Sequence, residues 1–159
     1  MEQSRSYKII GIILTVILSV MTVSNYSGYT NANKDSELLR ADLKTAFSQQ
    51  QLAYEDVPEM QSRFEGFNEQ LENKLVPNVY RQKSLYRLIG CIVSLFGIAL
   101  LRNGKFIGFH LFLGGMAVGI LAAFYTFGFG MIGWLFNVTY ILFTAAVSIY
   151  YYTKKKYLM

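Results

Sequence analysis

The stretch from Phe106 to Phe127, "FIGFHLFLGGMAVGILAAFYTF", contains no Asp, Glu, Lys or Arg, and it decides the fold class. An α-helix rises about 1.5 Å per residue, so about 17 to 20 apolar residues cross the hydrocarbon core of a membrane. Three further blocks are about as long and as apolar: Ile9 to Val23 with an extension through Tyr29, Leu85 to Leu101, and Met131 to Tyr152. The sequence therefore predicts an all-α membrane protein with four transmembrane helices.

The alternatives to this prediction are a soluble bundle and a cleaved leader. A soluble bundle is disfavoured because four nearly uncharged runs leave it no polar surface. Arg5 and Lys8 precede the first block as in a signal peptide, but no small-x-small cleavage site with alanines follows, so we expect this helix to be retained. The predicted organisation is a tail and first transmembrane helix over 1–30, a helical hairpin over 31–84, and transmembrane helices 2 to 4 with a basic tail over 85–159.

Orientation follows from the basic residues near the helix ends. With four crossings, the two termini share one side of the membrane with the loop from Arg102 to Lys105. That side carries seven clustered basic residues and only one acid, Glu2, whereas every other acid lies in the segment from Asn31 to Ser84. We expect both termini to be cytoplasmic and the hairpin to be extracytoplasmic, in a cell inner (plasma) membrane.

The net charge of +5 and the pI near 9.3 would suggest nucleic acid as the partner of a soluble protein. Here the basic residues flank apolar helices, so we expect anionic lipid headgroups as their partners and no nucleic acid. The predicted headgroup contacts are Arg81, Lys83, Arg87, Lys154, Lys155 and Lys156. The first three lie on the predicted outer side, against the charge bias that sets the orientation.

The segment between the first two apolar blocks predicts two helices that are separated at Val57-Pro58. The second helix carries an apolar seam at intervals of four, three, four and four residues: Met60, Phe64, Phe67, Leu71 and Leu75. Two helices of this length seldom bury enough surface to be stable alone. Either they cover each other and rest on lipid or on the loop between transmembrane helices 3 and 4, or the seam docks a partner chain.

Each apolar block also carries a stripe of small or weakly polar residues, which predicts close helix packing because lipid gives helices no hydrophobic reason to associate. The stripes comprise Gly11, Thr15, Ser19 and Thr22; Gly90, Ser94 and Gly97; Gly104, Gly108, Gly115 and Gly119; and Gly133, Asn137, Thr144 and Ser148. The alternative is a narrow polar path or a lipid-sized pocket lined by Thr15, Ser94, Asn137 and Thr144.

The residue types that catalysis and metal binding need are scarce. A metal site normally takes three or four convergent ligands, but the chain has one cysteine, Cys91, and one histidine, His110, in separate blocks. No phosphate-binding loop and no nucleophile with a base is recognisable. We expect no enzyme, no cofactor and no metal, and we expect His110 to form hydrogen bonds at the membrane interface.

The start of the third block, "RNGKFIGFHLFLGG" from Arg102 to Gly115, resembles the short Arg/Lys-Gly-Phe-x-Leu/Phe entries of small uncharacterised bacterial four-helix inner-membrane proteins. The resemblance implies a bacterial inner membrane. It implies no activity and no residue roles.

Together these patterns favour a non-enzymatic accessory or assembly subunit of a larger membrane complex. Its expected partners are other integral membrane proteins and membrane lipids, contacted through the small-residue stripes and the hairpin. The main alternative is a small homo-oligomeric channel or transporter with Asn137 and Thr144 near its path. Less favoured are a lipid-modifying enzyme that uses His110 with Arg102 and Lys105, and a sensor whose hairpin binds a ligand.

Overall fold

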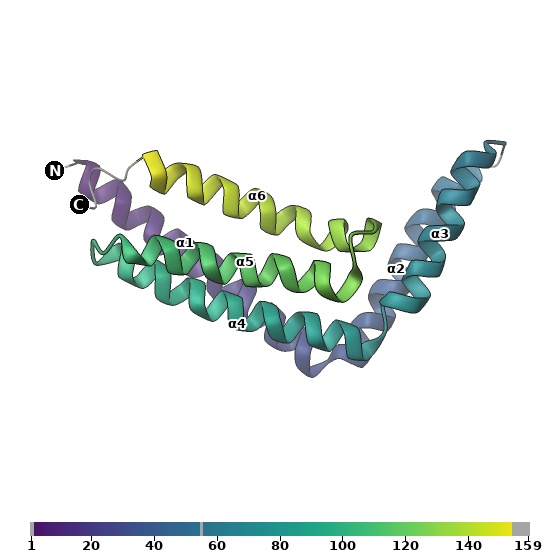
Figure 1. Ribbon diagram of the computed structural model, residues 1–159, viewed down its shortest axis with the longest axis horizontal. Coiled ribbons are helices and arrows are strands. Elements are labelled where there is room, and N and C mark those ends of the chain that lie inside the picture. The colour runs from purple at the N-terminus through teal and green to yellow at the C-terminus, as the bar shows by residue number, and fades with distance from the viewer. Residues whose placement is uncertain (1, 55, 154–159) are drawn as a thin grey trace.

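The computed structural model describes residues 2–54 and 56–153, and the side chains from residue 8 onward within these ranges. The described residues form six helices and no strand (Figure 1). The helices are α1 (Glu2–Thr30), α2 (Ala32–Ala53), α3 (Pro58–Lys74), α4 (Pro77–Arg102), α5 (Ile107–Phe127) and α6 (Met131–Thr153).

Four of these helices, α1, α4, α5 and α6, are long and apolar enough to cross a membrane. The predicted set of four apolar helices is therefore confirmed, and the chain is a multi-pass membrane protein. In Figure 1 the four helices run alongside one another. The start of α1, the end of α6 and the α4–α5 loop lie at one end of this bundle, and α2 and α3 lie at the other.

One predicted boundary differs from the structure. The second transmembrane helix was expected to begin at Leu85, but α4 begins at Pro77. Proline is suited to the first turn of a helix, where its missing N–H leaves no hydrogen bond unmade, and the polar residues that follow remain helical. Lys83 and Arg87 are consequently on the same continuous helix as the apolar block.

Helices α4 and α5 form the most extensive pairing in the molecule. A methyl group added at Gly90 would meet the carbonyl oxygen of Gly115, and one added at Gly97 would lie 2.6 Å from the carbonyl oxygen of Gly108. Ser94 Oγ, between these two contacts, donates a hydrogen bond of 3.1 Å to the Phe112 carbonyl. The two backbones therefore touch directly, which only glycine permits.

The other predicted packing residues have different surroundings. Gly104 lies beyond the end of α4, in a turn with φ of 76° and no neighbour within 4 Å of an added methyl group, so its assignment to a helix contact was wrong. A methyl group added at Gly133 would meet the carbonyl oxygen of Gly128, which lies in the turn before α6. Thr144 and Ser148 donate to carbonyl oxygens of α6 itself, at 2.6 Å each, so their hydroxyls are used within one helix.

Helices α2 and α3 form the hairpin that the break at Val57-Pro58 predicts. Phe47 of α2 packs against Phe64 and Phe67 of α3, with ring centroids 6.3 and 4.1 Å apart. Lys44 Nζ forms an ion pair of 2.7 Å with Glu72 Oε1, which holds the pKa of that exposed carboxyl below its usual range. Figure 1 shows the hairpin leaving the bundle at a steep angle and rising past the level of α6.

The seam of α3 is covered within the chain. Phe64, Phe67, Leu71 and Leu75 are buried, the last two fully. Leu71 and Leu75 pack in one cluster with residues of the bundle end: Ala123, Phe127 and Ile132. Among the residues assigned to partner binding, only Met60 is half-buried. The expectation that the whole row docks a partner is therefore corrected: α2 and the α5–α6 end of the bundle already cover four of the five residues, and Met60 remains partly accessible at a groove.

The backbone contact between α4 and α5 can be tested at neighbouring glycines. A Gly115→Ala methyl group would meet the backbone of Gly90 and Ser94, whereas a Gly114→Ala methyl group meets nothing within 4 Å. We expect Gly115→Ala to lower the free energy of unfolding in mild detergent by about 1–3 kcal/mol, the usual effect of overpacking. Gly114→Ala should be neutral or slightly stabilising. Equal stability of the two variants would contradict the contact.

Candidate functional site

The strongest candidate site is a group of polar side chains inside the bundle, centred on Arg87 of α4. Arg87 is only 4% exposed. Its Nε donates a hydrogen bond of 3.3 Å to the Gly119 carbonyl of α5. Its Nη2 donates to the Phe136 carbonyl at 2.8 Å and to Asn137 Oδ1 at 2.9 Å, both on α6. One guanidinium group thus joins three of the four membrane-spanning helices.

The glycine and asparagine positions explain why the guanidinium can lie there. Gly119 has no side chain to cover its carbonyl oxygen, and an added methyl group would lie 3.6 Å from Cγ of Arg87, so the arginine stem passes alongside it. Asn137 is fully buried, and its Nδ2 donates at 3.2 Å to the Ile120 carbonyl. The amide of Asn137 therefore accepts from α4 and donates to α5.

A second set of contacts extends the polar layer to α1. The guanidinium carbon of Arg87 lies 4.0 Å from the centroid of the Tyr140 ring, which gives a cation–π contact. The hydroxyl of Tyr140 accepts a hydrogen bond of 2.8 Å from Asn25 Nδ2 of α1. Cys91 Sγ lies 3.8 Å from Asn25 Nδ2 and 3.9 Å from the Tyr140 hydroxyl. Side chains of α1, α4 and α6 and a carbonyl of α5 thus form one connected layer.

Lys83 lies one turn before Arg87 and is also 4% exposed. Its ammonium is 3.8 Å from the centroid of the Tyr80 ring and 4.4 Å from that of the Phe136 ring. Within the described residues the one ion pair is that between Lys44 and Glu72, so neither buried cation has a carboxylate within 4 Å in this part of the chain. Aromatic rings stabilise the charge of Lys83, and carbonyl oxygens, an amide and the Tyr140 ring stabilise that of Arg87.

These positions correct the expectation that Lys83 and Arg87 contact lipid headgroups. Both side chains turn inward and are buried, whereas Arg81 is exposed. Lys154, Lys155 and Lys156 lie outside the described residues. The signal for the burial of Arg87 was present in the sequence, because Gly90, Ser94 and Gly97 follow it by three, seven and ten residues, on the same helix face.

The hydroxyls expected along a polar path have partners of other kinds. Thr15 donates to the Gly11 carbonyl of its own helix at 2.7 Å. Thr144 does the same with Tyr140, and Ser94 bonds across the α4–α5 contact. His110 is exposed, with its ring centroid 5.3 Å from that of Phe106 and 6.0 Å from that of Phe109. The structure therefore brings together Arg87 and Asn137 but none of these four residues.

The chemistry that this layer offers is noncovalent: its hydrogen bonds hold neighbouring helices together. An arginine stays protonated, so it cannot exchange a proton at neutral pH. Among the described residues no three His, Cys, Asp or Glu side chains lie close enough together to hold a metal ion. The layer can fix four helices relative to one another.

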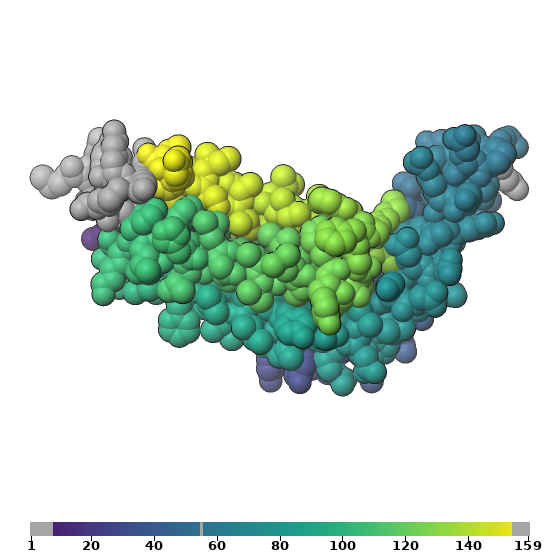
Figure 2. Space-filling view, viewed as in Figure 1, coloured from purple at the N-terminus to yellow at the C-terminus, as the bar shows by residue number. Residues whose placement is uncertain are grey.

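A separate groove lies between the hairpin and the start of α6. Its volume is about 470 Å³, and it is lined by Phe47, Gln50, Ala53, Tyr54, Met60, Arg63, Phe64, Phe67 and Met131. Figure 2 shows the hairpin standing away from the bundle, with a hollow between them. The groove is mainly apolar and is positioned by the angle at which the hairpin leaves the bundle.

No family model, no curated protein and no solved structure matches this chain.

The cross-linking role of Arg87 predicts the stability of its variants. Arg87→Met leaves Asn137 Oδ1 without its donor, and a buried unsatisfied acceptor costs about 1–3 kcal/mol. Arg87→Lys should lose a similar amount, because an ammonium lacks the planar fork that reaches two helices at once. The measurement is unfolding in mixed detergent micelles, with exposed Arg81→Met as the control, for which we expect a change within about 0.5 kcal/mol.

A double variant separates the network from simple loss of charge. Arg87→Met combined with Asn137→Leu removes donor and acceptor together, so it should be more stable than the sum of the two single changes predicts. Strictly additive effects would show that the two side chains do not act as one network.

Proposed function

We propose that this protein is a non-enzymatic accessory or assembly subunit of a larger membrane protein complex. In this proposal it resides in a cell inner (plasma) membrane, with both termini cytoplasmic and the α2–α3 hairpin extracytoplasmic. The cluster of seven basic residues at the termini and in the α4–α5 loop supports this orientation. The partners are other integral membrane proteins, bound within the membrane and at its outer surface.

The observation that carries the proposal is that the hairpin extends beyond α6 at a steep angle to the bundle in Figure 1. The hairpin rises past α6 instead of continuing along the bundle axis (Figure 1). If the bundle stands across the membrane, the hairpin extends along the outer surface, next to the exposed face of α6. That face includes Leu142, which is 66% exposed, and Ile149, which is also 66% exposed. The hairpin and the exposed face of α6 meet at an angle, and the space that these two surfaces border is called the corner below.

The corner suits a neighbouring protein helix. Ala145 and Ala146 are exposed on α6, and small side chains allow a second helix to approach closely in lipid. Outside the hydrocarbon, the apolar groove that contains Met60 and Phe47 has no acyl chains to cover it. A partner that crosses the membrane beside α6 and emerges under the hairpin would cover both surfaces at once.

Photo-crosslinking at matched positions tests this arrangement. Leu142 of α6 and Val20 of α1 are exposed to nearly the same extent, 66% and 64%, and both lie about 15 to 17 Å from the hairpin-side ends of their helices. A photoreactive amino acid at Leu142 should yield one discrete product with another membrane protein, which also co-purifies with the tagged chain in mild detergent. The same residue at Val20 should yield no such product.

The proposal fails if both positions give only lipid adducts, or if the tagged chain at native expression is recovered only as a monomer or a homo-oligomer.

The second candidate is a small homo-oligomeric channel or transporter, and the burial of Arg87 and Lys83 favours it. Ionisable groups within membrane helices are typical of transport pathways, and both cations lie on one face of α4.

Liposomes that contain the purified protein should then pass a solute, with anions favoured by the two positive charges. Asn137→Leu should abolish that flux, whereas exposed Val138→Leu should not; the absence of flux for every tested ion and metabolite would exclude this function.

A further inference from the structure

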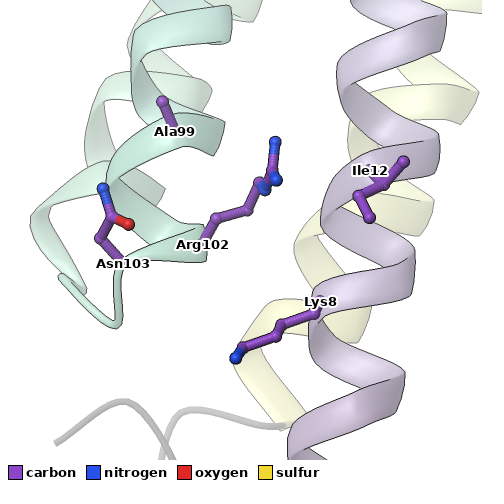
Figure 3. Close-up of a pocket in the computed structure, with 5 residues that line it drawn as sticks. All are labelled: Lys8, Ile12, Ala99, Arg102 and Asn103. Atoms are coloured by element: carbon purple, nitrogen blue, oxygen red, sulfur yellow. The ribbon is translucent and has the colours of Figure 1, made fainter.

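A second pocket lies at the opposite end of the bundle, between α1 and α4 next to the α4–α5 loop. Its volume is about 490 Å³, and it is lined by Lys8, Ile12, Ala99, Arg102 and Asn103 (Figure 3). None of the residues assigned above to lipid headgroups or to helix packing lines this pocket.

Two cationic side chains line the pocket from facing helices. In Figure 3 the Arg102 side chain extends from α4 toward α1 and along the bundle to the level of Ile12 and Ala99, whereas the Lys8 side chain extends from α1 toward α4 nearer the α4–α5 loop. No lining residue is acidic, and neither cation has a carboxylate within 4 Å among the described residues. Two unpaired cations that face the same space create a positive potential there, which favours an anion.

The depth of the pocket identifies the kind of anion. Lys8 directly precedes the apolar block of α1, which begins at Ile9, and Arg102 is the last residue of α4. Ile12 and Ala99 lie about one helical turn deeper in the same two helices. The ammonium of Lys8 therefore lies at the level of lipid phosphates, and the guanidinium of Arg102 reaches deeper along the bundle, beside the apolar part of the pocket (Figure 3).

A glycine holds Arg102 in this position. A methyl group at Gly11 would lie 2.6 Å from Cγ and 3.2 Å from Cδ of Arg102. The aliphatic stem of the arginine thus rests on the bare backbone of α1, and its guanidinium is directed into the pocket instead of outward into solvent.

We propose that this pocket binds the phosphate of an anionic phospholipid from the leaflet at the terminal end of the bundle. The guanidinium of Arg102 and the ammonium of Lys8 contact the phosphate oxygens, and the side-chain amide of Asn103 supplies a further donor. The start of the acyl chains lies against Ile12 and Ala99. The inference rests on the pocket alone and does not depend on the partner proposed above.

Native mass spectrometry of the full chain in a neutral detergent tests the site, with phosphatidylglycerol and phosphatidylcholine as probes. A cation near the membrane surface contributes about a fivefold gain in affinity for anionic lipid. We expect wild type to bind phosphatidylglycerol at least tenfold more tightly than phosphatidylcholine. Lys8→Gln combined with Arg102→Gln should reduce this preference to about twofold or less.

The control variant combines Lys34→Gln with Lys74→Gln. It removes the same net charge from exposed residues at the hairpin end, so it should keep the preference. Inorganic phosphate at millimolar concentration distinguishes a lipid from a free anion, because it lacks the glycerol and acyl parts and should not displace the bound lipid.

Gly11→Leu provides a test that changes no charge. Its side chain occupies the space of the Arg102 stem, so the preference for phosphatidylglycerol should fall at least threefold. Gly114→Leu, at a glycine where an added methyl group meets nothing within 4 Å, should leave the preference unchanged. The proposal is overturned if wild type shows no preference, if the Lys8/Arg102 variant retains it, if Gly11→Leu has no effect, or if phosphate displaces the lipid.

Discussion

The hydrocarbon of a membrane imposes the constraint on which the rest of this structure depends. It offers polar groups no hydrogen-bond partner, and it gives apolar helices no hydrophobic gain when they associate. The α4–α5 contact meets the second condition, because Gly90, Gly97, Gly108 and Gly115 let the two backbones touch. Arg87 meets the first, because carbonyl oxygens of α5 and α6 and one amide take the place of water around its guanidinium. Glycine is central to both solutions.

The cationic side chains at the two ends of the bundle have different surroundings. At the hairpin end, Lys83 and Arg87 are enclosed by aromatic rings and carbonyl groups of the chain itself. At the terminal end, Lys8 and Arg102 face an open pocket. Buried charges whose partners are internal are suited to fixing helix positions, whereas charges at an open pocket remain available to a ligand. The proposed lipid site and the internal polar layer are therefore separate features of one basic protein.

The sequence predicted the elements better than it predicted which side chains face inward. Block length and the lack of charge identified four apolar helices, and Pro58 marked the break in the hairpin, because both signals are local. The hydrogen-bond partner of Arg87 depends on α6 supplying Asn137 at the correct depth, and the covering of Leu71 and Leu75 depends on the angle of the hairpin; no local pattern encodes either. Gly104 matched the spacing of the stripe on the third transmembrane helix, yet α5 begins only at Ile107. The inward face of α4 could have been recognised by aligning Arg87 with Gly90, Ser94 and Gly97.

The claim that the bundle crosses the membrane, with the hairpin and the α4–α5 loop on opposite sides, is tested most directly by cysteine accessibility. In a Cys91→Ser background, single cysteines replace Leu52 at the hairpin, which is 73% exposed, and exposed Asn103 in the loop. A membrane-impermeant thiol reagent added to intact cells should label the Leu52→Cys protein immediately, and the Asn103→Cys protein only after the membrane is permeabilised. Labelling of both positions from the same side would contradict the four-span arrangement.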